Sequence, residues 1–198
     1  QIARVCLDML KALSFMHSIQ CVHRDMKSDN ILCNSRGELK LADFGFAIQL
    51  ASRDELRDSV IGTPYWMAPE IIIGGGYSFN VDVWSLGIII MEMAEGDPPY
   101  MDHAPLKAMV LISREGIPPL MAPGQWSPKM KDFLSQCLNP DRKLRPSAEQ
   151  LLHHEFLLSA ASNESMAQLL RDAAKAEEQL HEDLGELADE FKELDLIF

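Results

Sequence analysis

The chain has 198 residues, of which 47% are hydrophobic and 24% are charged. These fractions are close to those of ordinary folded domains, so they exclude disorder along the whole chain. Acidic side chains outnumber basic ones by 30 to 18, which gives a formal net charge of -12. This balance argues against long-range attraction to nucleic acid or to an anionic membrane, and it favours basic protein substrates.

Cysteine usage and hydropathy indicate where the protein works. The four cysteines include no CxxC pair and no histidine cluster at metal spacing, which favours a reducing, cytoplasmic setting: Cys6, Cys21, Cys33 and Cys137. No charged-then-apolar leader opens the sequence. No uninterrupted apolar run is long enough to span a bilayer, so we expect no transmembrane segment.

The first predicted element is an amphipathic helix. Seven apolar residues fall on one stripe of such a helix: Ile2, Val5, Cys6, Met9, Leu10, Leu13 and Met16. Because the chain begins inside this helix and without a Met, we expect residues 1–198 to be a fragment of a longer protein.

A small hairpin and an irregular stretch follow the helix. Residues 31–45 contain two short apolar runs around an Asn-Ser-Arg-Gly turn, which predicts a pair of antiparallel strands. Residues 46–67 are mixed in polarity and show no period, and we expect a functional loop there. Glycines 74–76 lack the Lys and Ser or Thr of a phosphate-binding loop, so they predict a turn between helices.

The pattern from there to residue 158 is helical. Residues 81–96 are apolar nearly all round, as expected for a helix buried at the centre of a helical domain. Further helical patterns lie at residues 105–113, 127–138 and 147–157, and a Ser occupies the N-cap position of the last two. The expected fold class is therefore mainly α with one small β-hairpin.

The last segment, residues 159–198, predicts an acidic helical tail. It holds eleven acidic and three basic side chains, which accounts for -8 of the net charge. From Met166 to Leu194, apolar residues recur at alternating spacings of three and four, a heptad-like seam. Glu177 interrupts the seam, and Gly185 weakens the helix by roughly 1 kcal/mol. Three interpretations stay open: a helix folded back onto its own domain, a solvated single helix, and a coiled coil or docking helix with a partner.

The motif HRDMKSDN and the DFG that follows it carry the residue types that phosphoryl transfer needs. Such a site orients the attacking hydroxyl, holds Mg²⁺ with oxygen ligands and places positive charge on the transferred phosphate. Asp25 is predicted to accept the proton of the substrate hydroxyl, and Lys27 to neutralise charge on the γ-phosphate of ATP. Asn30 and Asp43 are predicted to ligate Mg²⁺.

Together with three later motifs, these residues resemble the C-terminal lobe of eukaryotic protein kinases. The later motifs are GTPYWMAPE at residues 62–70, VDVWSLG at residues 81–87 and the Arg145 of KLRPSAEQLL, in the order of that family. The resemblance covers residues 1–158 and implies a partial kinase domain. The first helix, SDN, DFGF and VIGTPYWMAPE are similar to the p21-activated (PAK) serine/threonine kinases of the sterile-twenty group.

The resemblance implies roles in the site and in its regulation. Thr63 falls where serine/threonine kinases hold a Thr near the catalytic Asp and Lys. Ser59 takes the place of the activation-loop phosphosite, and a phosphate there would pair with Arg24. Asp29 and Glu92 match positions that receive an Arg shortly before the phosphoacceptor Ser of a protein substrate.

Four further residues match structural or nucleotide-contacting positions of the family. Glu70 and Arg145 match a buried ion pair. Asp82 matches the residue that braces the catalytic loop, and Leu32 matches the floor of the adenine pocket. For Glu92 a second interpretation stays open, a carboxylate inside an apolar helix that a neighbouring side chain satisfies.

ATP binding also requires a Gly-rich loop, a strand Lys and a helix Glu that pairs with it, and the sequence offers no candidate for these parts. Two hypotheses follow. In the first, the chain is the C-terminal lobe of an active PAK-like kinase, which Rho-family small GTPases control through a region outside this chain. In the second, the chain is a non-catalytic binding or scaffold module that uses the kinase-like lobe to hold partners.

Overall fold

The computed structural model describes residues 1–52 and 54–195, and it describes the side chains of the last helix up to residue 184. Most of these residues lie in helices, and two sheets of two short strands each complete the described structure. The expected fold class, mainly α with a small hairpin and a C-terminal helix, is therefore confirmed.

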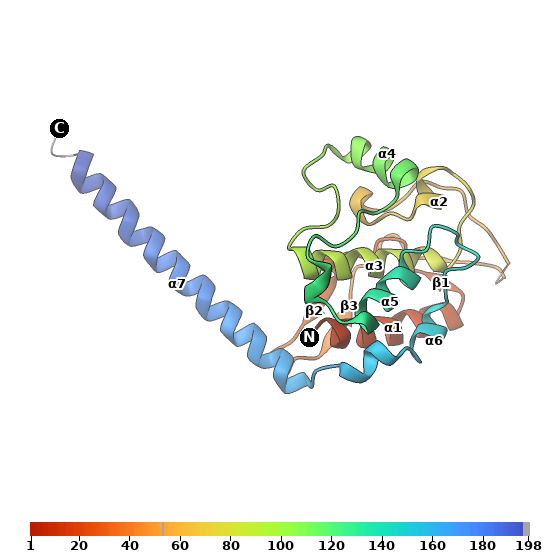
Figure 1. Cartoon of the computed structure of the whole chain (residues 1–198), viewed down its shortest axis with the longest axis horizontal. Helices are drawn as coiled ribbons and strands as arrows, with labels where there is room; N and C mark the ends of the chain where they lie inside the picture. Colours follow the sequence, from red (N-terminus) through yellow and green to blue (C-terminus); the bar gives the residue numbers. More distant parts are fainter. Residues whose placement is uncertain (53, 196–198) are drawn as a thin grey trace. The chain divides into compact units, whose positions relative to one another are not determined.

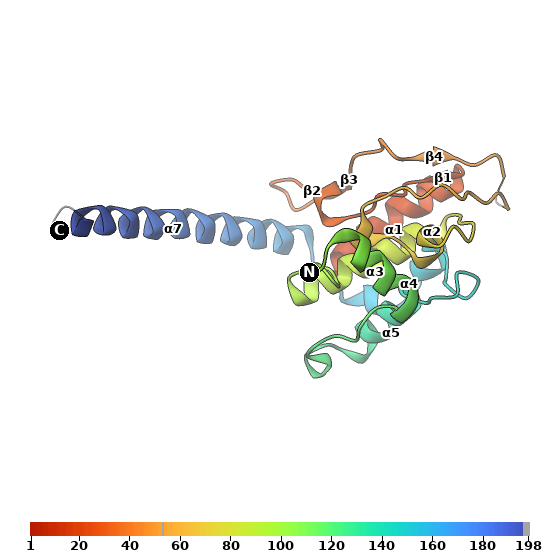
Figure 2. The ribbon, with the colours of Figure 1, turned by 90° about the horizontal axis from the view of Figure 1, so that it is seen from above.

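The chain divides into two compact units. The first comprises residues 1–32 and 39–161, and the second comprises residues 33–38 and the segment that begins at Ser162. Figure 2 shows the helices of the first unit gathered on one side of its short strands. The residues predicted to carry the chemistry all lie in this first unit.

Two helices carry the core of the first unit. Helix α1 (Ile2–Ser18) packs against α3 (Asn80–Glu95), and it buries the whole of its predicted apolar stripe except Ile2, which is half-buried. Helix α3 is buried without interruption from Val81 to Met91, which explains why it is apolar on every side.

Close packing between α3 and α5 (Pro128–Cys137) depends on a glycine. A Cβ at Gly87 would lie 2.7 Å from Leu138 Cδ2 and 2.9 Å from Cys137 Cβ. Because only a hydrogen atom fits there, any larger residue at this position would push the two helices apart.

The shorter helices surround this pair. Ser127 caps α5 by accepting from Met130 N, and Ser147 caps α6 (Ala148–Leu151) by accepting from Gln150 N, so both predicted N-caps are confirmed. The remaining short elements of the first unit are α2 (Pro69–Ile72), α4 (Pro105–Glu115) and the 3₁₀ helices η1 (Ser28–Asn30), η2 (Pro64–Trp66), η3 (Pro123–Gln125) and η4 (Glu155–Ser159).

The helix predicted over residues 147–157 is broken in the structure. Helix α6 ends at Leu151, and His154 Nδ1 accepts a hydrogen bond from Phe156 N at 3.1 Å. This bond makes His154 the cap of a new element, η4, so one predicted helix becomes two short ones.

Strands β2 (Ile31–Cys33) and β3 (Leu39–Leu41) form the predicted hairpin. Its turn contains Gly37 at a φ of 74°, a conformation that glycine adopts at no steric cost. A Cβ at this position would also collide with the backbone of Asn163, which belongs to the same compact unit. Position 37 of the turn therefore accepts no side chain.

A second small sheet was not predicted. Strand β1 (Cys21–Val22) pairs antiparallel with β4 (Ile48–Gln49), and Cys21 lies opposite Gln49. Two-residue strands show no period in a sequence, so only the folded chain reveals this pairing. The pairing joins β4, which follows the DFG motif, to β1, which precedes the HRD motif.

The expected C-terminal helix is present as α7 (Asn163–Asp195), one continuous helix through Gly185 (Figure 1). The seam positions after Leu184 lie beyond the described side chains: Leu187, Phe191 and Leu194. Within residues 1–52 and 54–195, no helix combines the length and the apolar character that a membrane crossing demands.

Cys6 and Cys137 are buried thiols, and their burial predicts that the folded state becomes less stable at high pH. Burial raises the pKa of Cys6 and Cys137 above the ordinary value of 9.0, and Cys6 raises that of Cys137 further. The unfolded chain loses these protons near pH 9 while the folded chain keeps them, so this contribution to stability is present below about pH 9 and is lost above it. We expect the thermal unfolding midpoint to fall as the pH rises from about 8 to about 10.

The variant Cys6→Ala/Cys137→Ala isolates this effect. Its midpoint should change less than that of the parent chain over the same pH range, because neither thiol remains to lose a proton. An equal fall in both proteins would assign the pH dependence to other groups.

Candidate functional site

A buried carboxylate holds the backbone of the HRD segment. Asp82 Oδ2 accepts from His23 N and Asp82 Oδ1 accepts from Arg24 N, each at 2.9 Å. His17 Nε2 lies 2.9 Å from Asp82 Oδ2, a contact that no sequence motif predicts. Arg24 has a φ of 69°, which residues with side chains seldom adopt, and the two bonds from Asp82 hold the chain in that form.

Asp25 lies almost fully buried beside two residues that were predicted to work with it. Its Oδ1 accepts two bonds from Thr63, from N at 2.9 Å and from Oγ1 at 2.6 Å. Lys27 Nζ lies 3.3 Å from Asp25 Oδ2 and donates to Thr63 Oγ1 at 3.2 Å. The structure thus places a carboxylate of fixed orientation next to a cation, an arrangement suited to phosphoryl transfer to a hydroxyl.

Asn30 and Asp43 lie on neighbouring segments. Asn30 Nδ2 donates to Asp25 O at 2.8 Å, which leaves the amide oxygen of Asn30 for a cation. Ala42 N donates to Asn30 O at 2.8 Å, so the DFG segment begins beside Asn30. Asp43 is exposed and has a φ of 58°, and its Oδ1 accepts from Gly45 N at 3.1 Å.

This pair of oxygen donors fits Mg²⁺. The ion is held in proteins by one or two carboxylates together with water and phosphate oxygens, so it does not need a cage of protein ligands. In the part of the chain that the structure describes, no group of three or more His, Cys, Asp or Glu side chains forms such a cage. Asn30 and Asp43 offer one amide oxygen and one carboxylate that could hold the ion.

Ser59 lies in a triangle of polar groups. Arg24 Nη1 donates to Ser59 Oγ at 3.3 Å and to the Tyr77 hydroxyl at 3.0 Å, and the two hydroxyls are 2.9 Å apart. Tyr77 also exchanges two backbone hydrogen bonds with Arg57, at 2.8 and 3.0 Å. Tyr77 is buried and escaped prediction, because a Tyr after three glycines belongs to none of the recognised motifs.

Glu92 is half-buried, and both of its oxygens accept hydrogen bonds. Ser28 Oγ donates to Oε1 at 2.6 Å, and Trp66 Nε1 donates to Oε2 at 3.1 Å. These contacts match the interpretation of Glu92 as a carboxylate satisfied by its neighbours. Ser28 also joins Glu92 to the segment that carries the exposed Asp29, so the substrate role of both carboxylates stays a prediction.

Glu70 and Arg145 form a buried, two-pronged ion pair. Arg145 Nη1 donates to Glu70 Oε1 at 2.6 Å, and Nη2 donates to Oε2 at 3.1 Å. Arg145 also donates to the carbonyls of Asn80 and Asn139, and its guanidinium lies 5.0 Å from the ring centroid of Trp84. The pair ties α2 to α3 and to the segment before α6.

Leu32, the predicted floor of the adenine pocket, is 57% exposed. Phe44 of DFG and Phe46 are exposed as well. Exposed apolar side chains can belong to surfaces that bind another group. Contact between Leu32 and a nucleotide stays a prediction.

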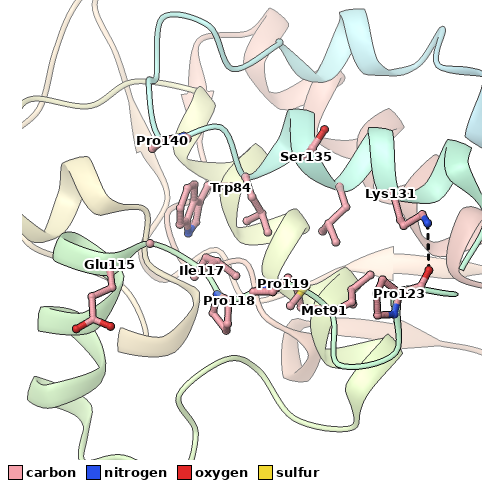
Figure 3. Close-up of a pocket in the computed structure, with 14 residues that line it drawn as sticks. Trp84, Met91, Glu115, Ile117, Pro118, Pro119, Pro123, Lys131, Ser135 and Pro140 are labelled. Carbon is pink, nitrogen blue, oxygen red and sulfur yellow. Dashed lines mark hydrogen bonds between the residues drawn. The ribbon is translucent and has the colours of Figure 1, made fainter. Parts of the chain in front are cut away.

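A cavity of about 500 Å³ lies between α3, α5 and the segment after α4, and it is lined by none of the predicted site residues (Figure 3). Its walls are mainly apolar and include Trp84, Met91 and several prolines of residues 117–123. Lys131 Nζ donates to Pro123 O at 3.1 Å along one side. The cavity therefore takes no part in the arrangement around Asp25.

A family model for the protein kinase domain matches residues 1–157. The chain belongs to the protein kinase family. The match includes every residue of the site described above and ends before α7 begins.

Several PAK kinases are similar to this kinase chain over most of its length. It is 50% identical over 179 residues to the serine/threonine-protein kinase pakA of Dictyostelium discoideum. The aligned residues make up 90% of this chain and 15% of pakA. For pakC of the same organism the identity is 51% over 173 residues, 87% of this chain and 36% of pakC. For the mouse (Mus musculus) serine/threonine-protein kinase PAK 1 it is 46% over 181 residues, 91% of this chain and 33% of PAK 1.

The similarity confirms the resemblance to PAK kinases. The chain spans between 15% and 36% of the length of these three relatives. The activity, substrates and partners of a whole kinase that contains it are therefore matters for proposal.

Proposed function

We propose that residues 1–158 are the substrate-binding lobe of an ATP-dependent serine/threonine protein kinase. The cluster of Asp25, Lys27 and Thr63 carries the proposal, because it places a cation and a hydroxyl in contact with one buried proton acceptor, Asp25. A lobe without catalytic duty has no chemical reason to keep this cluster beside two candidate ligands for Mg²⁺.

In the proposed reaction, the hydroxyl oxygen of a substrate Ser or Thr bonds to the γ-phosphorus of ATP while the bond from that phosphorus to ADP breaks. Asp25 accepts the hydroxyl proton, and the two bonds from Thr63 keep its carboxylate in one orientation. Lys27 offsets negative charge on the transferred group. Mg²⁺ held by Asn30 and Asp43 would neutralise charge on the phosphates.

The substrates that this lobe suits are proteins with an Arg shortly before the phosphoacceptor Ser. Asp29 is exposed, and Glu92 lies one hydrogen bond from the neighbouring Ser28. An Arg guanidinium could pair with either carboxylate. Control by Rho-family GTPases would act through a region outside this chain, and the buried thiols of Cys6 and Cys137 fit a reducing cytoplasm.

The test is phosphate transfer by the endogenous protein, captured with an antibody against α7. We expect it to transfer labelled phosphate from ATP to a Ser peptide with a preceding Arg, and more slowly to the same peptide with Ala in place of that Arg. A captured protein that binds the peptide without phosphorylating it would favour the second hypothesis, a non-catalytic binding module.

Phosphorylation of Ser59 is expected to activate the kinase. A phosphate there adds about two negative charges beside Arg24 Nη1, which orders the loop around Thr63 through charge-assisted bonds. Ser59→Ala should lower activity by about tenfold, the equivalent of one hydrogen bond to a charged group. Phosphatase treatment should lower the activity of the parent kinase and leave that of the Ser59→Ala variant unchanged.

Tyr77→Phe is the variant to compare with Ser59→Ala. It keeps Ser59 and removes only the Tyr77 hydroxyl, which contacts both Ser59 and Arg24. An equal loss of activity on phosphatase treatment in the parent and in Ser59→Ala would place the activating phosphate elsewhere.

A further inference from the structure

The cavity beside α3 is lined by a buried hydrogen-bond donor that has no acceptor. Trp84 is 1% exposed, and its Nε1 has no hydrogen-bond partner in the part of the chain that the structure describes. The guanidinium of Arg145 lies over the face of the ring, 5.0 Å from its centroid, so it does not satisfy the N–H at the ring edge. Such donors are rare in folded proteins, and an acceptor on a bound molecule would explain this one.

Figure 3 shows where this donor points. The edge of the Trp84 indole that carries the nitrogen faces Ile117 and Pro118, which line the other side of the cavity. The volume of the cavity is about 500 Å³, and its walls are mainly apolar. Cavities of this size and character bind small organic molecules. The cavity therefore suits a ligand with an apolar body and an oxygen acceptor.

A water molecule suits the position beside Trp84 Nε1 less well. Buried water is usually held by about two to four polar partners. The side chains of Ile117 and Pro118 supply none of them. A ligand carbonyl needs only the one donor, because the apolar body that carries it packs against the walls.

Charged side chains give the ligand a direction. Lys131 lies at the end of the cavity away from Trp84 in Figure 3, and its Nζ donates to the carbonyl oxygen of Pro123 at 3.1 Å. A carbonyl does not neutralise the ammonium charge, so a carboxylate is a better partner at this end. Glu115 lies at the Trp84 end, where its negative charge would repel a carboxylate and leave a neutral acceptor favoured.

We propose that this cavity binds a small carboxylic acid with an apolar, ring-containing body and a neutral carbonyl group. The carbonyl oxygen accepts from Trp84 Nε1, and the carboxylate pairs with Lys131. The rings pack against Met91 and the prolines of residues 117–123. This site goes beyond phosphoryl transfer and does not rest on it, because it shares no residue with the cluster around Asp25.

The test uses the full chain and three compounds of matched shape, each with two phenyl rings. Para-benzoylbenzoate has both the ketone and the carboxylate. Para-benzylbenzoate has a methylene group in place of the ketone, and para-benzoylbenzamide has an uncharged amide in place of the carboxylate. We expect titration calorimetry to give the first compound an affinity at least about fivefold higher than that of either of the others.

The indole signal of Trp84 reports the hydrogen bond directly. The chain has three tryptophans, so its proton–nitrogen NMR spectrum contains three indole signals, and Trp84→Phe identifies that of Trp84. Para-benzoylbenzoate should shift this signal downfield, because the N–H gains an acceptor, and para-benzylbenzoate should shift it less. The signal of Trp66, whose Nε1 already donates to Glu92, is the internal control.

Two variants test the carboxylate end without altering the core. Lys131→Met should weaken the binding of para-benzoylbenzoate by at least about fivefold and leave that of para-benzoylbenzamide unchanged. The matched control is Lys129→Met, which removes the same charge from α5 at a position outside the lining of the cavity. Its affinity for para-benzoylbenzoate should equal that of the parent chain.

Several results would overturn the proposal. Equal affinities for the benzoyl and benzyl compounds would remove Trp84 Nε1 as the donor. An equal loss in Lys131→Met and Lys129→Met would reduce the role of Lys131 to net charge. Failure of all three compounds to bind would exclude this class of ligand.

Discussion

Arg145→Met will lower the free energy of unfolding of the chain by about 3–5 kcal/mol, because it leaves the Glu70 carboxylate buried without its partner. The substitution also removes the donors to two backbone carbonyls, of Asn80 and Asn139. Since the net stability of a domain is about 5–15 kcal/mol, this single change removes a large fraction of it. Urea unfolding followed by tryptophan fluorescence measures the loss.

Two comparisons identify the cause. The double variant Glu70→Met/Arg145→Met should be more stable than Arg145→Met alone, because no uncompensated carboxylate remains inside the protein. Arg36→Met breaks an exposed ion pair with Glu38 and should leave the unfolding midpoint unchanged. A double variant no more stable than Arg145→Met would show that the buried charge is not the source of the loss.

Asp25→Asn will lower kcat of the parent kinase by about 10²–10⁴-fold, because the amide keeps the shape of the side chain but cannot accept the hydroxyl proton. Thr63 N can still donate to the retained side-chain oxygen, so the fold around the loop should persist. The change is made in the endogenous gene, and phosphate transfer and ATP binding are measured on the captured protein. We expect ATP binding to change little.

The matched control is Asp97→Asn, the same chemical change at an exposed carboxylate that no part of the proposed site contacts. Its kcat should equal that of the parent kinase, and both variants should unfold at the same temperature as the parent. Full phosphate transfer by Asp25→Asn would remove Asp25 from the role of general base.

Local patterns predict the elements that repeat a period or use a specific cap. The apolar stripe of α1 and the all-round apolar composition of α3 are such patterns, and the capping hydroxyls of Ser127 and Ser147 are specific local contacts. The pairing of β1 with β4 depends on contacts between distant segments, so no window of sequence contains it. The break between α6 and η4 depends on one ring nitrogen of His154.

The candidate site also has a part that local motifs predict and a part that they do not. The order of HRDMKSDN and DFG predicts which residue types take part, and the structure brings Asp25, Lys27 and Thr63 into contact. The order of motifs does not reveal Tyr77 beside Ser59 or His17 beside Asp82, because those neighbours come from other segments of the chain. Tertiary packing alone decides these contacts.

Helix α3 serves three purposes along one length: Asp82 holds the HRD backbone, Gly87 admits α5, and Glu92 bonds to Ser28. Substitutions on this helix will therefore change protein abundance and activity together, since a loosened core shifts the helix that positions the loop. In a genetic selection, second-site suppressors of α3 variants should be general stabilisers dispersed over the lobe rather than compensating changes near Asp25. Helix α3 therefore limits which substitutions this lobe can accept during evolution.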